Sequence, residues 1–203
     1  MKKTLHLMTQ ILFLVIFIFL ILNDKVQLWI GLFLLGIVAS IFLGRIYCGW
    51  VCPINTTMSA VVWIKKKLHL ENRSIPRVIT KPWMRFIILG LFIAAFIFSM
   101  SSGTKIPIFP FLFILGILFT VFFSEALWHC YLCPFGIILS YSASRSSHSM
   151  IIDSDKCNNC GVCRNTCPAN AVVKMEKHKI ILNKCLICME CSNNCKQNAI
   201  NYK

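Results

Sequence analysis

Residues 157–168 read Cys-Asn-Asn-Cys-Gly-Val-Cys-Arg-Asn-Thr-Cys-Pro, and the same spacing of four cysteines returns 28 residues later in residues 185–195. Three cysteines separated by two residues can bind one 4Fe–4S cluster, while the fourth, after three more residues, binds the neighbouring cluster. The repeat therefore predicts two 4Fe–4S clusters with crossed ligands. The expected ligands are Cys157, Cys160, Cys163 and Cys195 for one cluster and Cys185, Cys188, Cys191 and Cys167 for the other. Zinc is the alternative metal, but zinc sites usually present two separated cysteine pairs.

The residues around this repeat predict a small α+β ferredoxin domain. Two short apolar segments, 150–152 and 199–202, can pair as strands and bring the ends of the domain together. Residues 172–174 and 179–182 flank a polar turn and predict a hairpin. Lys196 stands where Pro168 follows the fourth cysteine of the first repeat, a change that affects a turn but removes no ligand.

The remainder of the chain is too apolar for an ordinary soluble domain, since 57% of the 203 residues are hydrophobic and 14% are charged. Four stretches carry no Asp, Glu, Lys or Arg and are long enough to span a bilayer as helices: 5–22, 26–43, 86–104 and 106–124. The first stretch is followed by no small-residue cleavage site, so we interpret it as an uncleaved helix. The predicted fold is an all-α four-helix transmembrane domain (1–134), a serine-rich linker (135–149) and the α+β two-cluster ferredoxin domain (150–203).

The basic residues predict the orientation. The chain has 21 Lys and Arg against 7 Asp and Glu, and eight of the basic residues lie between the second and third stretches. The other two connections hold only Lys25 and Lys105. Because basic loops are retained in the cytoplasm, we expect a multi-pass protein of the cell (inner) membrane with both termini cytoplasmic. Residues 57–70 are interpreted either as a basic amphipathic helix on the inner membrane face or as a solvated basic loop.

The positive charge indicates lipid rather than nucleic acid as the partner. Residues 150–203 contain eight basic and four acidic residues, and two clusters with thiolate ligands, each carrying about −2, would make this domain nearly neutral. It also lacks the aromatic platforms on which nucleic-acid bases stack.

The predicted membrane domain has two halves that end alike. Residues 44–53 read Gly-Arg-Ile-Tyr-Cys-Gly-Trp-Val-Cys-Pro, and residues 128–134 read Trp-His-Cys-Tyr-Leu-Cys-Pro. Each follows the second helix of a predicted pair, so both cysteine pairs emerge on the cytoplasmic side. Three interpretations of Cys48, Cys52, Cys130 and Cys133 stay open: a third metal centre, most plausibly iron–sulfur; a redox-active dithiol or transient copper site; and small buried thiols at helix ends.

Other cofactors leave no signature in the sequence. None of the five histidines lies in the middle of a predicted span to bind haem, and no glycine-rich dinucleotide fingerprint is present. Arg45, Glu125 and His129 lie at the predicted inner surface, where they could contact a quinol head group or accept its protons. Each residue also has a competing role without quinol. Arg45 could be a positively charged anchor at the inner membrane surface, Glu125 a solvated carboxylate at a helix end, and His129 a hydrogen-bonded histidine with no function in the site.

Together, the four stretches, residues 44–53, the second Cys-Pro element and the two cysteine repeats resemble the membrane-bound polyferredoxin family typified by the quinol-dehydrogenase membrane subunit of periplasmic nitrate reductase systems. The resemblance implies an electron-transfer component with clusters on the cytoplasmic side that couples a quinol pool to a partner redox protein. Cys130 and Cys133 depart from the family pattern, since two residues separate them where three are usual. No residue is assigned a bond-making role, and a non-enzymatic redox sensor or metal-centre assembly factor is the competing class.

Overall fold

The computed structural model describes residues 3–70, 73, 75–76, 79–101 and 108–203. Two compact units make up the chain, one comprising Met1–Pro53 with Ile138–Lys203 and the other Ile54–Ile137. Arg77 and Lys105, two of the basic residues in the charge argument, lie outside the described residues.

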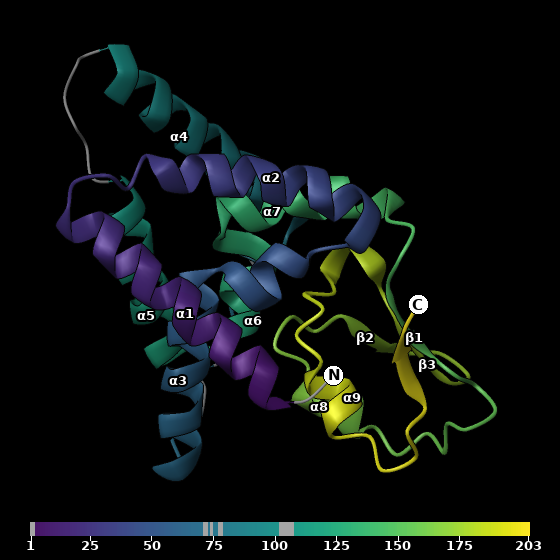
Figure 1. Ribbon diagram of the computed structural model, residues 1–203. Coiled ribbons are helices and arrows are strands. Elements are labelled where there is room, and N and C mark those ends of the chain that lie inside the picture. The colour runs from purple at the N-terminus through teal and green to yellow at the C-terminus, as the bar shows by residue number, and fades with distance from the viewer. Residues whose placement is uncertain (1–2, 71–72, 74, 77–78, 102–107) are drawn as a thin grey trace. The chain divides into compact units, whose positions relative to one another are not determined.

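The first unit begins with two apolar helices, α1 (Lys3–Leu22) and α2 (Leu28–Leu43) (Figure 1). Phe17 of α1 packs edge-on against Trp29 of α2, with 5.0 Å between ring centroids. Helix α2 ends at Gly44, whose φ of +70° is a left-handed conformation that a glycine adopts without strain. The chain then enters a π-helical turn, η1 (Tyr47–Val51).

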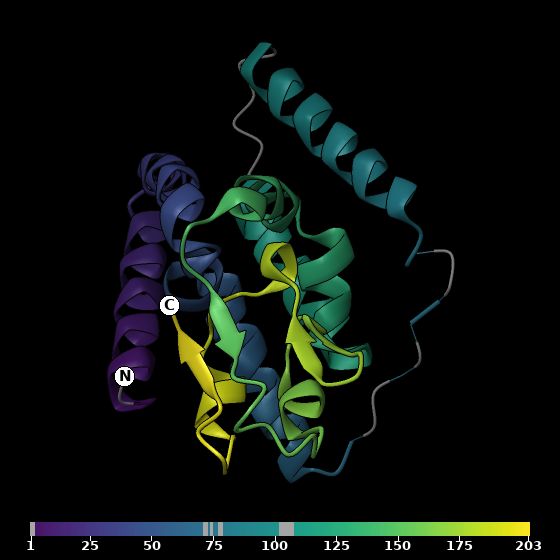
Figure 2. The ribbon, with the colours of Figure 1, turned by 90° about the vertical axis from the view of Figure 1, so that its right-hand side faces the viewer.

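The same unit contains the ferredoxin domain, which is built from two small antiparallel sheets. Strand β1 (Met150–Ile152) pairs with β4 (Ile200–Tyr202), as Figure 2 shows, and β2 (Val172–Lys174) pairs with β3 (His178–Ile180). Both predicted strand pairings are confirmed. Strand β3 begins one residue before the predicted segment and ends early, because residues 182–184 form a 3-10 turn, η4 (Leu182–Lys184).

Two short helices complete this domain, α8 (Val162–Thr166) and α9 (Glu190–Asn193), and they lie side by side (Figure 1). Each begins just before the third cysteine of its repeat. The domain core contains Met150, Val172, Ile180, Ile187 and Ile200, contributed by all four strands or by the second cysteine loop. The core therefore holds the two cysteine repeats against each other.

The second unit consists largely of helices α3 (Pro53–Lys67), α4 (Pro82–Ser101), α5 (Ile108–Phe122) and α6 (Glu125–Leu127), with a second π-helical turn, η2 (Trp128–Leu132). Residues 57–67 are helical, so the helical part of that interpretation is confirmed and the loop interpretation is wrong, while the place of this helix on the inner membrane face stays a prediction. Lys65 is 6% exposed and donates a hydrogen bond to the carbonyl oxygen of Thr120 at 3.0 Å.

The serine-rich segment 135–149 differs from the linker that we expected. It contains most of helix α7 (Pro134–Ser142) and a 3-10 turn, η3 (Ala143–Arg145). Serines in this segment bond back to carbonyl groups, as Ser142 does to Leu139 at 3.2 Å and Ser144 to Tyr141. These bonds give the serine hydroxyl groups partners within the segment, so its serine-rich composition is compatible with helix, although composition alone favoured a linker.

Two of the described helices are long and apolar enough to cross a membrane, α1 and residues 82–99 of α4. Helices α2 and α5 are apolar but have 16 and 15 residues, which correspond to lengths of about 24 and about 23 Å. A bilayer core is about 30 Å thick. The expected domain of four transmembrane helices is therefore not confirmed by helix length. Residues 26 and 27, the first two of the second expected span, form a turn rather than helix, and the first two residues of the fourth expected span lie outside the described residues.

Candidate metal centres

The eight cysteines of the ferredoxin domain line two cavities. The first has Cys157, Cys160, Cys163 and Cys195 in its wall, and we call it the Cys157 cavity. The second has Cys167, Cys185, Cys188 and Cys191 in its wall, and we call it the Cys185 cavity. Each repeat thus contributes three thiols to one cavity and its fourth thiol to the other. This is the grouping that the spacing assigns to the two clusters, while the ligand assignment itself stays a prediction.

The two cysteine repeats also share their backbone conformation. Residues at equivalent positions of the two repeats share a positive φ: Asn159 and Ile187, Gly161 and Met189, and Asn170 and Asn198. Alternation of right- and left-handed residues turns successive N–H groups toward one concave side and forms a nest for an anion, as in many iron–sulfur sites. The backbone N–H groups of Ile187 and Glu190 bond to the thiols of Cys185 and Cys188. The cavity walls therefore fit a negatively charged, sulfur-rich group.

Burial makes the thiols of the Cys185 cavity poor acids. It raises the pKa of Cys185 to about 11 and that of Cys191 to about 12, and it raises the pKa of Cys188 well above the usual thiol value. Neighbouring thiols add to each rise, and the Arg45 guanidinium opposes it at Cys185. Burial also raises the pKa of Cys163 in the other cavity. Thiolates at these positions therefore need a bound cation to hold their charge.

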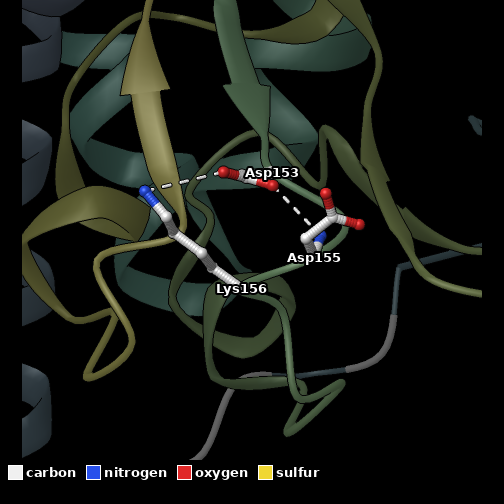
Figure 3. A network of polar contacts seen from close by, with 3 residues as sticks. All are labelled: Asp153, Asp155 and Lys156. Atoms are coloured by element: carbon white, nitrogen blue, oxygen red, sulfur yellow. Dashed lines mark hydrogen bonds and ion pairs between the residues drawn. The ribbon is translucent and has the colours of Figure 1, made fainter.

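Between β1 and Cys157, the first cysteine in the wall of the Cys157 cavity, the chain forms a turn that Asp153 stabilises (Figure 3). One carboxylate oxygen of Asp153 accepts a hydrogen bond from the backbone N–H of Asp155 at 3.0 Å, and the other lies 3.7 Å from Nζ of Lys156. The Asp153 carbonyl accepts the N–H of Cys157 at 3.1 Å. This turn fixes the first cysteine of the repeat, while Cys160 remains exposed.

One residue in the wall of the Cys157 cavity was not singled out as a site residue from the sequence. His178, the first residue of β3, is 6% exposed, lines this cavity, and its Nδ1 has no hydrogen-bond partner. No spacing relates it to the cysteines, so only the fold brings it there. Among the described residues, no three His, Cys, Asp or Glu side chains gather closely enough to hold a single metal ion.

The other two cysteine pairs share a local conformation. Cys52 and Cys133 each end a π-helical turn with an extended backbone, and the N–H of each bonds to a carbonyl five residues earlier, in Tyr47 and Trp128, at 2.9 Å. A proline follows each cysteine and begins a helix. Alignment of the two turns pairs Cys48 with His129 and Gly49 with Cys130. The unequal spacing therefore reflects a one-residue shift of the first cysteine within the same turn.

These pairs lie in different units, Cys48 and Cys52 in the first and Cys130 and Cys133 in the second. In the first unit, Cys48 is buried and its sulfur accepts a contact from Nη2 of Arg45 at 3.7 Å. In the second unit, Cys133 is buried and its sulfur accepts the N–H of Gly136 at 3.3 Å.

The three polar residues considered for a quinol head group have different surroundings. Arg45 is 1% exposed, and its Nη1 faces the carbonyl oxygens of Asn183 and Lys184 at 3.4 Å each. It is therefore buried against the ferredoxin domain rather than exposed as a surface anchor. Glu125 is half-buried at the start of α6, and His129 is 4% exposed within η2.

Comparison with known proteins agrees with the cysteine pattern. A family model described as a 4Fe–4S binding domain matches residues 26–71 and 106–148, and a second model of the same description matches residues 150–173. The first match includes both pairs of cysteines outside the ferredoxin domain. No solved structure matches the chain.

Relatives include an uncharacterized protein of Methanocaldococcus jannaschii, which is 30% identical over 73% of this chain and 61% of its own length. The ferredoxin-type protein NapH of Haemophilus influenzae is 26% identical over 73% of this chain and 56% of its own length. The methylamine utilization ferredoxin-type protein MauN of Paracoccus denitrificans is 29% identical over 71% of this chain and 55% of its own length. The matched part of the chain thus spans a little over half the length of these relatives.

Proposed function

Because the chain belongs to the NapH-like family of polyferredoxins with 4Fe–4S binding domains, we propose that it is a membrane-bound electron carrier. It passes single electrons between quinol in the bilayer and a soluble redox protein. The observation that carries this proposal is the division of eight thiols into two cavities of four, each with nest-forming backbone.

In this proposal, Cys157, Cys160, Cys163 and Cys195 hold one 4Fe–4S cluster, and Cys167, Cys185, Cys188 and Cys191 hold the other. Bound clusters supply one-electron redox chemistry without any bond made to substrate. The chain's residues supply thiolates, exclude water and fix the distance between the two centres. The contact of α8 with α9 supports a short path between the cavities.

Exposed apolar surface supports a membrane location. None of residues 82–99 of α4 is buried within the protein, although this segment is long and apolar enough to cross a membrane. Such a surface needs an apolar partner, and lipid matches its length. We propose that the shorter helices α2 and α5 also span the bilayer, because a short span is accommodated by local thinning of the lipid.

Contacts within the first unit support a common, cytoplasmic side for its ends. His6 and Gln10, near the beginning of α1, bond to the carbonyl of Gly49 at 2.9 and 2.8 Å. Tyr202 donates a hydrogen bond to the carbonyl of Leu43, at the end of α2, at 3.0 Å. The start of α1, the end of α2 and the ferredoxin domain therefore lie at the same end of this helix pair, as the distribution of basic residues favours.

We propose a third metal centre of iron–sulfur type at Cys48, Cys52, Cys130 and Cys133. The 4Fe–4S family match over both segments supports it, as does the shared turn geometry of Cys52 and Cys133. His129, which occupies the position equivalent to Cys48, is a further candidate ligand in the second turn.

The experiment that tests the electron-carrier function is anaerobic purification of the full chain into vesicles that contain a reduced quinone. Electron paramagnetic resonance (EPR) spectra before and after addition of the quinol, with dithionite as the reference reductant, measure how much iron–sulfur signal the quinol produces. We expect quinol to produce a large part of the dithionite signal. A protein that dithionite reduces and quinol does not would contradict the proposed donor and favour the sensor or assembly class.

A further inference from the structure

The contact between η1 and the second cysteine loop gives the two cavities different roles. We infer that η1 is where electrons pass between the membrane helices and the ferredoxin domain, and that it serves the Cys185 cavity. The Cys157 cavity is then the one that exchanges electrons with the soluble redox protein. This inference rests on the proposed electron-carrier function and adds the order of the centres to it.

The backbone of η1 touches the backbone of the loop between Cys185 and Cys188. A Cβ atom at Gly49 would lie 2.3 Å from the carbonyl oxygen of Leu186 and 3.2 Å from the amide nitrogen of Cys188. Both neighbours are backbone atoms that cannot turn aside as a flexible side chain would. Only a glycine allows this approach, so a ligand-bearing loop lies directly against the segment that follows α2.

Hydrogen bonds hold this contact from both sides. Trp50, the next residue of η1, donates from Nε1 to the carbonyl oxygen of Ile187 at 3.0 Å. The Gly49 carbonyl accepts bonds from His6 and Gln10 of α1. Helix α1 therefore fixes η1, and η1 fixes the loop.

Arg45 forms a second connection between the two parts. Its buried guanidinium contacts Cys48 on one side and the carbonyl groups of Asn183 and Lys184 on the other. Those carbonyls directly precede Cys185. A single positively charged group therefore lies between a membrane-side thiol and a thiol of the Cys185 cavity, where it stabilises added negative charge on either side.

No described residue covers the equivalent loop of the first repeat in this way. Asn158 and Asn159 occupy the positions of Leu186 and Ile187 and are exposed, whereas Leu186 and Ile187 are each 2% exposed. Cys160 is likewise exposed. The apolar residues of the second loop match a covered surface, and the polar residues of the first loop match one that stays accessible to a soluble protein.

The electron balance follows from the donor. The quinol loses two electrons and two protons in two successive one-electron steps. The protons pass to water at the membrane surface, and each electron that passes through the chain reduces the soluble redox protein by one electron. The η1 residues undergo no redox change. They keep the Cys185 cavity at a fixed short distance from the membrane side.

Matched substitutions in the two repeats test the order. Cys160→Ser and Cys188→Ser change equivalent positions in the two cavities, and the full chain in quinol-containing vesicles is compared with the same sample reduced by dithionite. We expect quinol to reduce the cluster that remains in Cys160→Ser as fast as in the unchanged protein. We expect loss of quinol-driven reduction in Cys188→Ser, while dithionite still produces a signal. The opposite pattern would overturn the inference.

Substitutions of two glycines test the contact between η1 and the second cysteine loop without altering a cluster ligand. They also test the order of the centres if Cys188→Ser retains no cluster. Gly49→Ala forces the backbone clash, whereas Gly31→Ala in α2 meets no atom within 4 Å. For Gly49→Ala we expect slower quinol-driven reduction, an altered EPR line shape for the cluster of the Cys185 cavity, and an unchanged line shape for the other. Gly31→Ala should match the unchanged protein.

The two proposals fail differently. If Gly49→Ala keeps the original quinol-driven rate and line shapes, the inference is overturned and the electron-carrier function stands. If quinol fails to reduce the unchanged protein, which dithionite reduces, the proposed donor fails and the inference fails with it.

Discussion

Trp50 Nε1 donates a hydrogen bond to the carbonyl oxygen of Ile187 across 137 residues of sequence, at 3.0 Å. Ile187 has a φ of +54°, which is costly for a β-branched residue. Such a conformation persists only where the surroundings determine it, and here Trp50 and the close approach of Gly44 and Gly49 do so. The strained Ile187 is therefore one of the residues through which the second cysteine loop contacts η1.

The crossed ligand sets predict a specific loss of iron. Cys195→Ser should remove the cluster of the Cys157 cavity, although Cys195 belongs to the second repeat, and iron should fall from about eight to about four atoms per ferredoxin domain. Cys167→Ser is the matched variant and should remove the other cluster. EPR spectra of each variant, compared with those of a second variant at Cys157 or Cys185, identify which cluster remains. If each substitution damages the cluster of its own repeat, the crossed assignment is wrong.

The positive φ angles predict a difference in stability. In Gly161→Ala, the new Cβ would have no contact closer than His178 Nε2 at 3.9 Å, so the cost is that of the left-handed backbone, about 1–2 kcal/mol. At the equivalent position, Met189→Gly should be more stable than Met189→Ala by a similar amount. The temperature at which the visible absorbance of the clusters is lost measures both. Equal values for the two Met189 variants would contradict this explanation.

The raised thiol pKa values predict pH-dependent iron binding in the Cys185 cavity. With pKa values of about 11 and about 12, Cys185 and Cys191 are protonated at neutral pH, as is Cys188, whose pKa burial also raises, and all three must release their protons when iron binds. Apparent affinity should therefore rise with pH, by about a thousandfold per unit for three protons, and fall as pH is lowered. Iron retention against a chelator in Cys160→Ser, between about pH 6 and about pH 9, measures this. A pH-independent loss of iron would contradict it.

The proposed third centre predicts more iron than two clusters hold. The full chain should bind more than about eight iron atoms, and Cys52→Ser and Cys133→Ser should each remove the excess without changing the EPR signals of the ferredoxin domain. Gly31→Ala, which alters no thiol, is the control for general damage to the helices. If the unchanged chain, Cys52→Ser and Cys133→Ser all bind about eight iron atoms, there is no third centre, and these cysteines have only a structural role at the ends of helices.

The topology predicts where reporters become active. A fusion at Ser101 should report the external side, and one at Lys203 should report the cytoplasm, because the basic connection between α2 and α4 is retained inside. A fusion at Lys67 serves as an internal control. An external signal at Lys203 would refute the cytoplasmic location of the ferredoxin domain.

The sequence by itself determined the features that depend on local spacing. The cysteine repeat predicted which thiols share a cavity, because a loop of two residues between cysteines leaves little freedom. The short apolar segments around it predicted both strand pairs. Average hydropathy identified apolar helices but not their ends: Gly44 and the turn before Leu28 limit α2 to 16 residues, and such backbone turns leave no mark in hydropathy.

Only the tertiary structure decided how the cavities differ. The contacts of Gly49 and Trp50 with residues 186–187, the burial of Arg45 beside Cys48, and the place of His178 in a cavity wall all join residues far apart in the chain. Each depends on how separate elements pack, and no periodicity or spacing encodes such a pair. The sequence therefore specifies two similar thiol sites, and packing against η1 makes one of them the covered site while the other remains accessible.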